Sequence, residues 1–89
     1  MKKEAEEWFK KGSYASESGN IDEAIRCYRK TIEIDPDNAA VYIKLGAAYY
    51  RKEMFDEAVT EFKQAIALDP DNEDARINLR HAYVKKNES

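Results

Sequence analysis

The residues best suited to chemistry in this chain are few and stand alone. His81 is the only histidine and Cys27 the only cysteine. The chain therefore lacks the second cysteine of a disulfide and the four Cys or His ligands of a typical structural zinc site. Enzymes gather acid, base or nucleophilic groups in a protected pocket, and the sequence shows no such set. We therefore expect a non-enzymatic protein. His81 is interpreted as a groove-edge or surface side chain, with a pH-sensitive partner contact as the alternative, and Cys27 as a small, partly buried side chain.

The segment Asp35-Pro36-Asp37-Asn38 resembles the opening of a calcium-binding loop. Such loops need a glycine at the sixth position and a bidentate glutamate at the twelfth. Here the sixth position is not glycine, the twelfth is Gly46, and the proline interrupts the ligand pattern. We interpret these residues as a turn followed by a helix cap, and we expect neither a metal ion nor a cofactor.

Length and composition limit the possible classes. The chain has 89 residues, of which 43% are hydrophobic and 37% charged; it is too apolar for a disordered chain and too charged for a membrane span. A net charge of −3 gives no basic surface for nucleic acid. The first twenty residues contain no apolar signal segment. These features predict a single domain, residues 1–89, that is soluble and cytoplasmic.

The chain repeats itself with a period of 34 residues. Residues 5–38 and 39–72 share 11 identical positions, and the block Asp-Pro-Asp-Asn recurs at 35–38 and 69–72. Residues 73–89 begin a third copy. A repeat of this length is typical of arrays in which each unit buries its apolar side against the next.

Each repeat divides into two helices separated by a turn. Gly19 can adopt the left-handed conformation that ends a helix, and Asn20 with Glu23 forms a pair that caps the next one. In the second repeat Glu53 and Met54 replace the glycine and asparagine, so that turn should be less well capped. The predicted fold is an all-α, antiparallel helix-pair solenoid of five helices near 3–18, 21–34, 39–52, 55–68 and 73–86.

These residues resemble the tetratricopeptide repeat family. The second repeat matches the family at every signature position, with Tyr42, Leu45, Gly46, Tyr49, Ala58, Phe62, Ala65 and Pro70. The first repeat departs from it at Lys11, Ala15 and Thr31. In the last helix, about 73–86, Arg76 and Arg80 replace residues that would face a second helix, which indicates a capping helix exposed to water. The resemblance implies a protein–protein interaction module.

The resemblance also implies a binding surface, the concave face lined by the first helices. The residues that map to this groove are Phe9, Ser13, Ile43, Lys44, Ala47, Tyr50, Arg51, Ile77, Asn78, His81 and Val84. We expect a hydrophobic or amphipathic peptide to lie there, with Lys44, Arg51 and Lys85 contacting acidic groups. In the alternative, Phe9, Ile43 and Ile77 mainly pack neighbouring first helices together.

Two further predictions concern the partner. One subfamily clamps the C-terminal carboxylates of chaperones with Lys and Asn on the first helix, Asn on the third, and Lys and Arg on the fifth. The matching positions here are Phe9, Ser13, Lys44, Asp74 and Asn78. None agrees, and Asp74 would repel a carboxylate, so we expect this partner class to be excluded. The alternative function is a self-associating, homo-oligomeric assembly unit or a designed scaffold without a dedicated ligand.

Overall fold

The computed structural model describes residues 1–88 and contains only helices and turns over that range. The helices are α1 (Lys3–Glu17), α2 (Ile21–Ile34), α3 (Ala39–Arg51), α4 (Phe55–Leu68) and α5 (Glu73–Glu88). All five begin at the predicted residue, and α5 continues two residues beyond its predicted end. The predicted all-α helix-pair solenoid is therefore confirmed.

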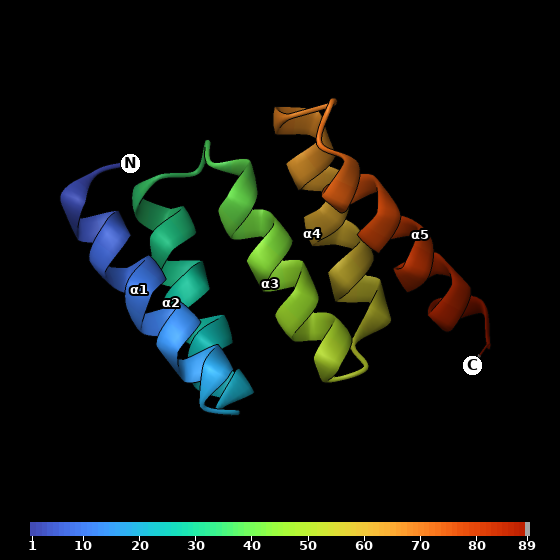
Figure 1. The fold of residues 1–89 in the computed structure, drawn as a ribbon, viewed down its shortest axis with the longest axis horizontal. Coiled ribbons are helices and arrows are strands. Elements are labelled where there is room, and N and C mark those ends of the chain that lie inside the picture. Colours follow the sequence, from blue (N-terminus) through green and yellow to red (C-terminus); the bar gives the residue numbers. More distant parts are fainter. Residues whose placement is uncertain (89) are drawn as a thin grey trace.

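The helices form two layers in an array of 38 × 28 × 17 Å. The first helices of each pair, α1, α3 and α5, lie in front in Figure 1, and α2 and α4 lie behind them. Within the array α2 also packs against α3, and α4 against α5. We call the surface formed by α1, α3 and α5 the groove face.

Glycines allow the two helices of each pair to approach closely. A Cβ atom at Gly46 would lie 2.6 Å from Cε1 of Phe62, and one at Gly12 would lie 2.6 Å from Cε1 of Tyr28. Both distances are too short for carbon atoms in van der Waals contact. The aromatic rings thus occupy the space that a side chain at either glycine would need, as the repeat pattern predicts.

The turns within the two pairs differ in the way the sequence predicts. Gly19 has φ +85°, and the side chain of Asn20 accepts a hydrogen bond from the backbone N–H of Glu23 at 3.3 Å. In the second pair Glu53 adopts φ +61°, and Met54 makes no side-chain cap to α4. A non-glycine residue in the left-handed region is destabilised by contact between Cβ and the following carbonyl.

Replacing Glu53 with glycine is therefore expected to stabilise the fold by about 1 kcal/mol. For a domain of this size that corresponds to a rise in melting temperature of roughly 4–8 °C. Thermal unfolding followed by circular dichroism measures it, with Gly19→Ala as the reciprocal variant that should lower the melting temperature. A lower melting temperature for Glu53→Gly would show that this turn carries no strain.

Ion pairs recur with the same period as the repeat. Lys52 at the end of α3 pairs with Asp22 at the start of α2, and Lys86 pairs with Asp56 at 2.9 Å. The two pairs are related by a shift of 34 residues. Each joins the last turns of a first helix to the second helix of the preceding pair, so the same contact recurs at both places where neighbouring helices stack.

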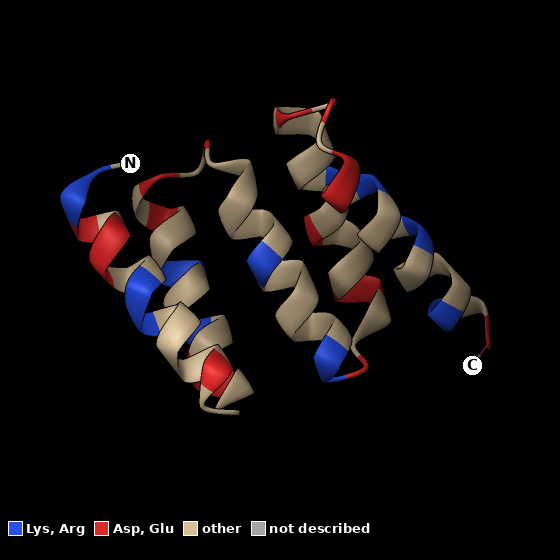
Figure 2. Cartoon of the chain, in the orientation of Figure 1, with Lys and Arg blue, Asp and Glu red and all other residues tan. Residues whose placement is uncertain are grey.

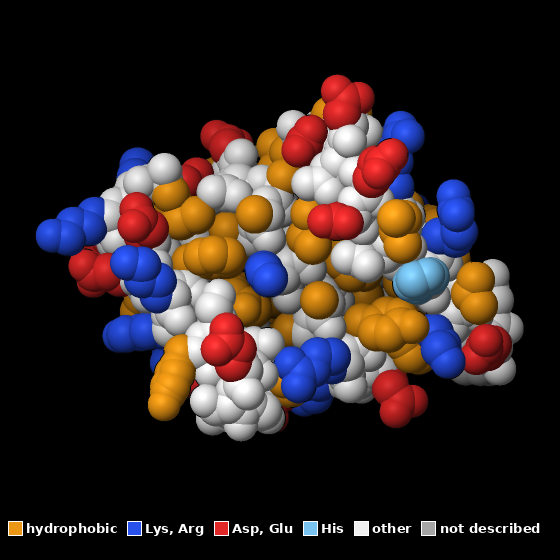
Figure 3. Space-filling model, in the orientation of Figure 1, with side chains coloured by type: hydrophobic (Ala, Val, Ile, Leu, Met, Phe, Trp, Pro, Cys, Tyr) orange, Lys and Arg blue, Asp and Glu red, His pale blue; other side chains and the backbone are white. Residues whose placement is uncertain are grey.

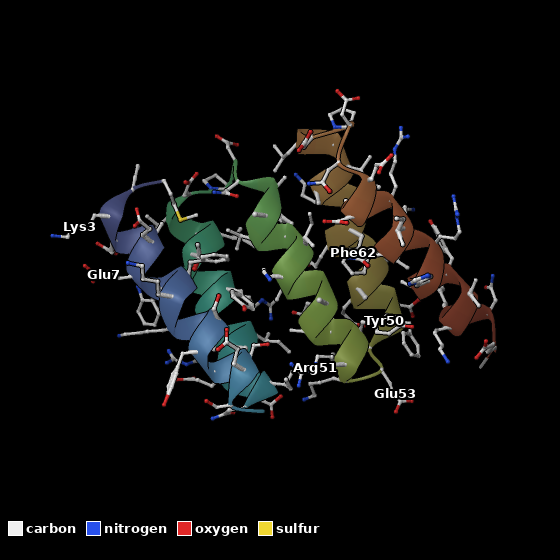
Figure 4. The ribbon with its side chains drawn as sticks, in the orientation of Figure 1. Lys3, Glu7, Tyr50, Arg51, Glu53 and Phe62 are labelled. Carbon is white, nitrogen blue, oxygen red and sulfur yellow. The ribbon has the colours of Figure 1, made fainter. Side chains whose placement is uncertain are left out.

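Both ends of the array carry charged side chains where the interior is apolar. Val41 and Leu45 of α3 are buried against the preceding pair, whereas Glu7, one period before Val41, is exposed on α1. Figure 4 shows Glu7 on the outer side of α1, away from α3. At the other end Arg76 and Arg80 of α5 are exposed, as expected for a capping helix.

Burial disfavours the ionisation of several side chains, among them Cys27 of α2 and Glu61 of α4. Burial raises the pKa of the Cys27 thiol, whose side chain is more completely buried than the sequence indicated. One period later Glu61 of α4 is half-buried, and burial raises the pKa of its carboxyl group, although Arg29 opposes the shift. The charged form of Glu61 is therefore less favourable in the folded chain than in the unfolded one.

Glu61→Gln is expected to raise the melting temperature at pH 7, because the variant removes a partly desolvated negative charge. A carboxyl group with a raised folded pKa binds protons more readily in the folded state, so the wild type gains stability as the pH falls through that pKa. The advantage of the variant should shrink as the solution is acidified and vanish where Glu61 is protonated in both states. Melting curves of both proteins at several pH values provide the test, and a pH-independent difference would contradict it.

Candidate functional site

All eleven residues predicted to form the groove lie on α1, α3 or α5. Their side chains differ in exposure. The half-buried members are Phe9, Ser13, Ile43, Ala47, Tyr50 and Asn78, and the exposed members are Lys44, Arg51, Ile77, His81 and Val84. The helix order therefore places the whole predicted set on the layer that forms the groove face.

A cavity of about 160 Å³ opens between α3 and α5. Its lining residues are Ala47, Tyr50, Arg51, Phe62, Asn78 and His81. Five of the six belong to the predicted groove set. In Figure 3 the single histidine lies beside a cluster of hydrophobic side chains on this side of the molecule. The structure thus brings together predicted residues from two helices that are separated in sequence by all of α4.

Phe62 is the cavity residue that the sequence does not predict. It belongs to α4 and is only 1% exposed, and its position in the repeat pattern assigns it to the core beside Gly46. Both descriptions hold, because its ring packs against Gly46 and also lines the cavity. A periodic pattern assigns a residue to one side of its helix and does not show that a core ring reaches the floor of a surface cavity.

Tyr50 and Arg51 are held in place by other parts of the array. The ring of Tyr50 meets that of Phe55 edge-on, with centroids 5.3 Å apart. Nη1 of Arg51 donates hydrogen bonds to the backbone oxygen and Oγ of Ser16, at 3.2 and 3.1 Å. Figure 4 shows Arg51 at the end of α3 on the side that faces away from Tyr50. Its guanidinium group joins α3 to the last turn of α1.

The apolar members of the groove set divide into two groups. Phe9 and Ile43 pack against the buried core, and the ring centroid of Phe9 lies 5.8 Å from that of Tyr28. Ile77 and Val84 on α5 are instead 45% and 52% exposed. Packing therefore accounts for Phe9 and Ile43, whereas the exposed apolar surface of the groove face lies mainly on α5.

Cations lie on the central helix of the groove face. The only Lys or Arg residues within α3 are Lys44 and Arg51, which are the two blue segments on this helix in Figure 2. They are separated by seven residues, or roughly 10 Å along the helix axis. On α5 the exposed carboxylate of Asp74 lies one turn before Asn78. The groove face thus combines an apolar cavity with positive charge on α3.

A larger cleft of about 550 Å³ lies between α2 and α4. Its walls include Arg29 and Lys30 on one side and Glu61 on the other, with Tyr42 and Leu45 at its base. The hydroxyl of Tyr42 donates a hydrogen bond to the backbone oxygen of Pro36 at 2.8 Å. This cleft is open and lined largely by charged side chains, and it contains none of the predicted groove residues.

Over residues 1–88 no three His, Cys, Asp or Glu side chains form a group that could hold a metal ion. None of the helices in that range has both the length and the apolar character needed to cross a membrane. The predicted cytoplasmic location stays a prediction.

Two protein-family models match the chain. One, described as TPR repeat, matches residues 16–53. The other, described as tetratricopeptide repeat, matches residues 39–72. The second range coincides with the second repeat found in the sequence. Together the two matches extend from the end of α1 to the turn before α5.

Solved structures with the same fold cover almost the whole chain. The first and second TPR domains of Spaghetti (RPAP3), each bound to the HSP90 peptide SRMEEVD, have TM-scores of 0.89 and 0.92, with 28% and 26% identity. They cover 94% and 97% of this chain, and this chain covers 68% and 80% of theirs. The TPR2B domain of yeast Sti1, in complex with pHsp70, has a TM-score of 0.90 and 27% identity, with coverage of 94% and 67% respectively.

Proposed function

This chain belongs to the tetratricopeptide repeat family, and we propose that it is a non-enzymatic module that binds a hydrophobic or amphipathic peptide across its groove face. The observation that carries this proposal is the cavity between α3 and α5, which is lined by five predicted groove residues. Exposed Ile77 and Val84 extend the apolar surface beside it. A concave, mostly apolar lining with a few polar groups is typical of ligand sites, and the Spaghetti domains described above are bound to peptides.

Charge supports an acidic component in the partner. Lys44 and Arg51 provide positive charge along α3, and the remaining N–H groups of Arg51 can donate to a carboxylate while Nη1 is bound to Ser16. Lys85 lies near the end of α5. An amphipathic peptide would place apolar side chains against the cavity and α5, and acidic side chains against these cations.

The test is a peptide-library screen followed by affinity measurements on the wild type and Tyr50→Ala. Truncating an aromatic side chain that lines the cavity should weaken binding of a selected peptide about tenfold or more. Because Tyr50 is only half-buried, the fold should survive, which a melting curve verifies. Ala40→Ser, at an exposed position at the start of α3, is the matched control. Unchanged affinity in a folded Tyr50→Ala variant would refute the proposal.

The same screen addresses the class of peptide. Among the positions that a carboxylate clamp would use, Phe9 packs against Tyr28 and Asp74 is an exposed negative charge. We therefore expect SRMEEVD, the peptide bound to the Spaghetti domains, to bind this chain less tightly than the best amphipathic peptide from the library. Equal or tighter binding of SRMEEVD would restore the chaperone-peptide class for this protein.

Self-association is the alternative function. The exposed residue Glu7 on α1 is acidic and the exposed residues Arg76 and Arg80 on α5 are basic, so an end-to-end contact would have to pair these charges to offset the cost of removing their water. Light scattering over a wide concentration range decides the matter. A constant mass near 10.3 kDa leaves the groove face free for a peptide, whereas a dimer would favour assembly.

A further inference from the structure

We propose that the cleft between α2 and α4 binds a free α-amino acid, whose carboxylate contacts Arg29 on α2 and whose ammonium group contacts Glu61 on α4. This site lies outside the groove face and does not depend on the peptide site described above. The cleft has a volume of about 550 Å³, which is within the range of about 300–1,000 Å³ that is typical of small-molecule sites. A small organic molecule therefore fits the cleft by size.

The packing of three helices forms this cleft. α2 and α4 each pack against α3, and both lie behind it in Figure 1. Tyr42 and Leu45 of α3 provide the floor, and Ile32 of α2 adds apolar surface beside them. The cleft therefore opens on the side of the array away from the groove face, and its apolar floor lies between two charged walls.

Two of the three cations that line the cleft are already paired. Arg26 donates two hydrogen bonds to the carboxylate of Glu23, at 2.7 and 2.9 Å, and Lys30 pairs with Glu33 at 3.5 Å. Arg29 makes no hydrogen bond or ion pair within the part of the chain that the structure describes. Its guanidinium group thus keeps its N–H donors for a ligand, and their planar arrangement suits bidentate contact with a carboxylate.

Glu61 provides the opposite charge on the facing wall. Its side chain is half-buried and makes no hydrogen bond or ion pair with another described residue, so only the attraction of Arg29 across the cleft offsets the effect of burial on its pKa. The repeat does not require a carboxylate here, because the residue one period earlier is Cys27. Charged groups that are kept at a cost to stability are typical of binding sites, and a ligand ammonium group would favour the ionised form of Glu61.

The two walls together select a ligand that carries both charges. A simple anion would be attracted by Arg29 and repelled by Glu61, and a simple cation would meet the reverse. An α-amino acid carries its ammonium and carboxylate groups on the same carbon atom, so each group can lie against the wall of opposite charge. Its side chain can then lie on the apolar floor, which favours a hydrophobic amino acid.

The experiment is a heteronuclear NMR titration of the full chain with L-phenylalanine at pH 6.5, where the amino groups of the probes are largely protonated. N-acetyl-L-phenylalanine keeps only the carboxylate, L-phenylalaninamide keeps only the ammonium group, and N-acetyl-L-phenylalaninamide has neither. L-phenylalanine is expected to shift the backbone amide signals of Arg29, Tyr42, Leu45 and Glu61 in a saturable way. It should bind about threefold more tightly than either singly charged analogue. Equal affinities for the four probes, or the absence of saturable shifts at these residues, would overturn the proposal.

Two variants assign the two contacts. In Glu61→Gln the ligand ammonium group should contribute nothing, so L-phenylalanine and its N-acetyl derivative should bind equally. In Arg29→Gln the ligand carboxylate should contribute nothing, so L-phenylalanine and its amide should bind equally. Both variants should fold, because Arg29 is exposed and Glu61→Gln removes a partly desolvated charge, and melting curves verify this.

Matched controls make the same changes of charge outside the cleft. They are Glu57→Gln on α4 and Arg80→Gln on α5, both at exposed positions that do not line it, and both should keep the wild-type preference for L-phenylalanine. If that preference survives in folded Glu61→Gln or Arg29→Gln, the contact assigned to that residue is wrong and the proposal fails.

Discussion

Replacing Phe62 with alanine is expected to destabilise the fold by about 4 kcal/mol and to leave the folded state only marginally stable at room temperature. The side chain is 1% exposed, and its removal would leave a void beside Gly46, whose lack of a side chain offers nothing to fill it. A domain of this size has a total stability near the lower end of the usual range of about 5–15 kcal/mol. The loss is therefore a large fraction of the whole.

Denaturant unfolding measures this effect, with Phe55→Ala as the matched control. Phe55 is an aromatic residue on the same helix, but it is only half-buried and its ring packs against Tyr50 near the surface. Its truncation should cost less than half as much. Equal losses for the two variants would mean that burial of Phe62 is not what stabilises the second pair.

Replacing Gly46 with valine should cost about 3 kcal/mol. The loss is nearly as large as that of Phe62→Ala, but it comes from overpacking the site and not from leaving a void. The new Cβ would lie 2.6 Å from the Phe62 ring, and the branched methyl groups would force the helices of the second pair apart. Overpacking of a close-packed interior costs about 1–3 kcal/mol. The higher helix propensity of valine than of glycine recovers only a few tenths of a kcal/mol, so the steric cost prevails.

Ala40→Val serves as the control, because Ala40 is exposed on the same helix and shows the effect of a valine without a packing clash, which is a loss below about 1 kcal/mol. A compensating pair identifies the cause. The double-mutant cycle uses Gly46→Ala, which adds only the Cβ atom. If this atom clashes with Phe62, the destabilisation caused by Gly46→Ala should be smaller in a Phe62→Leu background, and the cycle should give a favourable coupling energy. Additive losses would assign the cost of Gly46→Ala to another contact.

The fold of this chain and its partner choice depend on different residues. The signature positions set the helix pairs and their spacing, and they recur in any array of this family. The cavity depends on Ala47, Asn78 and His81, which lie outside the signature. Substitutions at these three positions are therefore expected to change binding more than stability, whereas Phe62 affects both because it belongs to the core and to the cavity floor.

The amino-acid sequence alone determined the helices and their order. Helix ends depend on neighbouring residues, and the signals at Gly19, Asn20 and Pro36 act through local backbone geometry. The poorer capping of the turn at Glu53 and Met54 could be predicted for the same reason, because the glycine and asparagine of the first turn are replaced there. The repeat period then placed the predicted groove residues on α1, α3 and α5.

Only the tertiary structure decided which of those residues meet. Arg51 contacts Ser16 on α1, Phe9 packs onto Tyr28, and Phe62 closes the cavity from α4. These contacts depend on how closely helices distant in sequence approach and on which way long side chains turn. A periodic pattern gives the face of a helix but contains no information about such distances, so the cavity became visible only when α3, α4 and α5 were packed together.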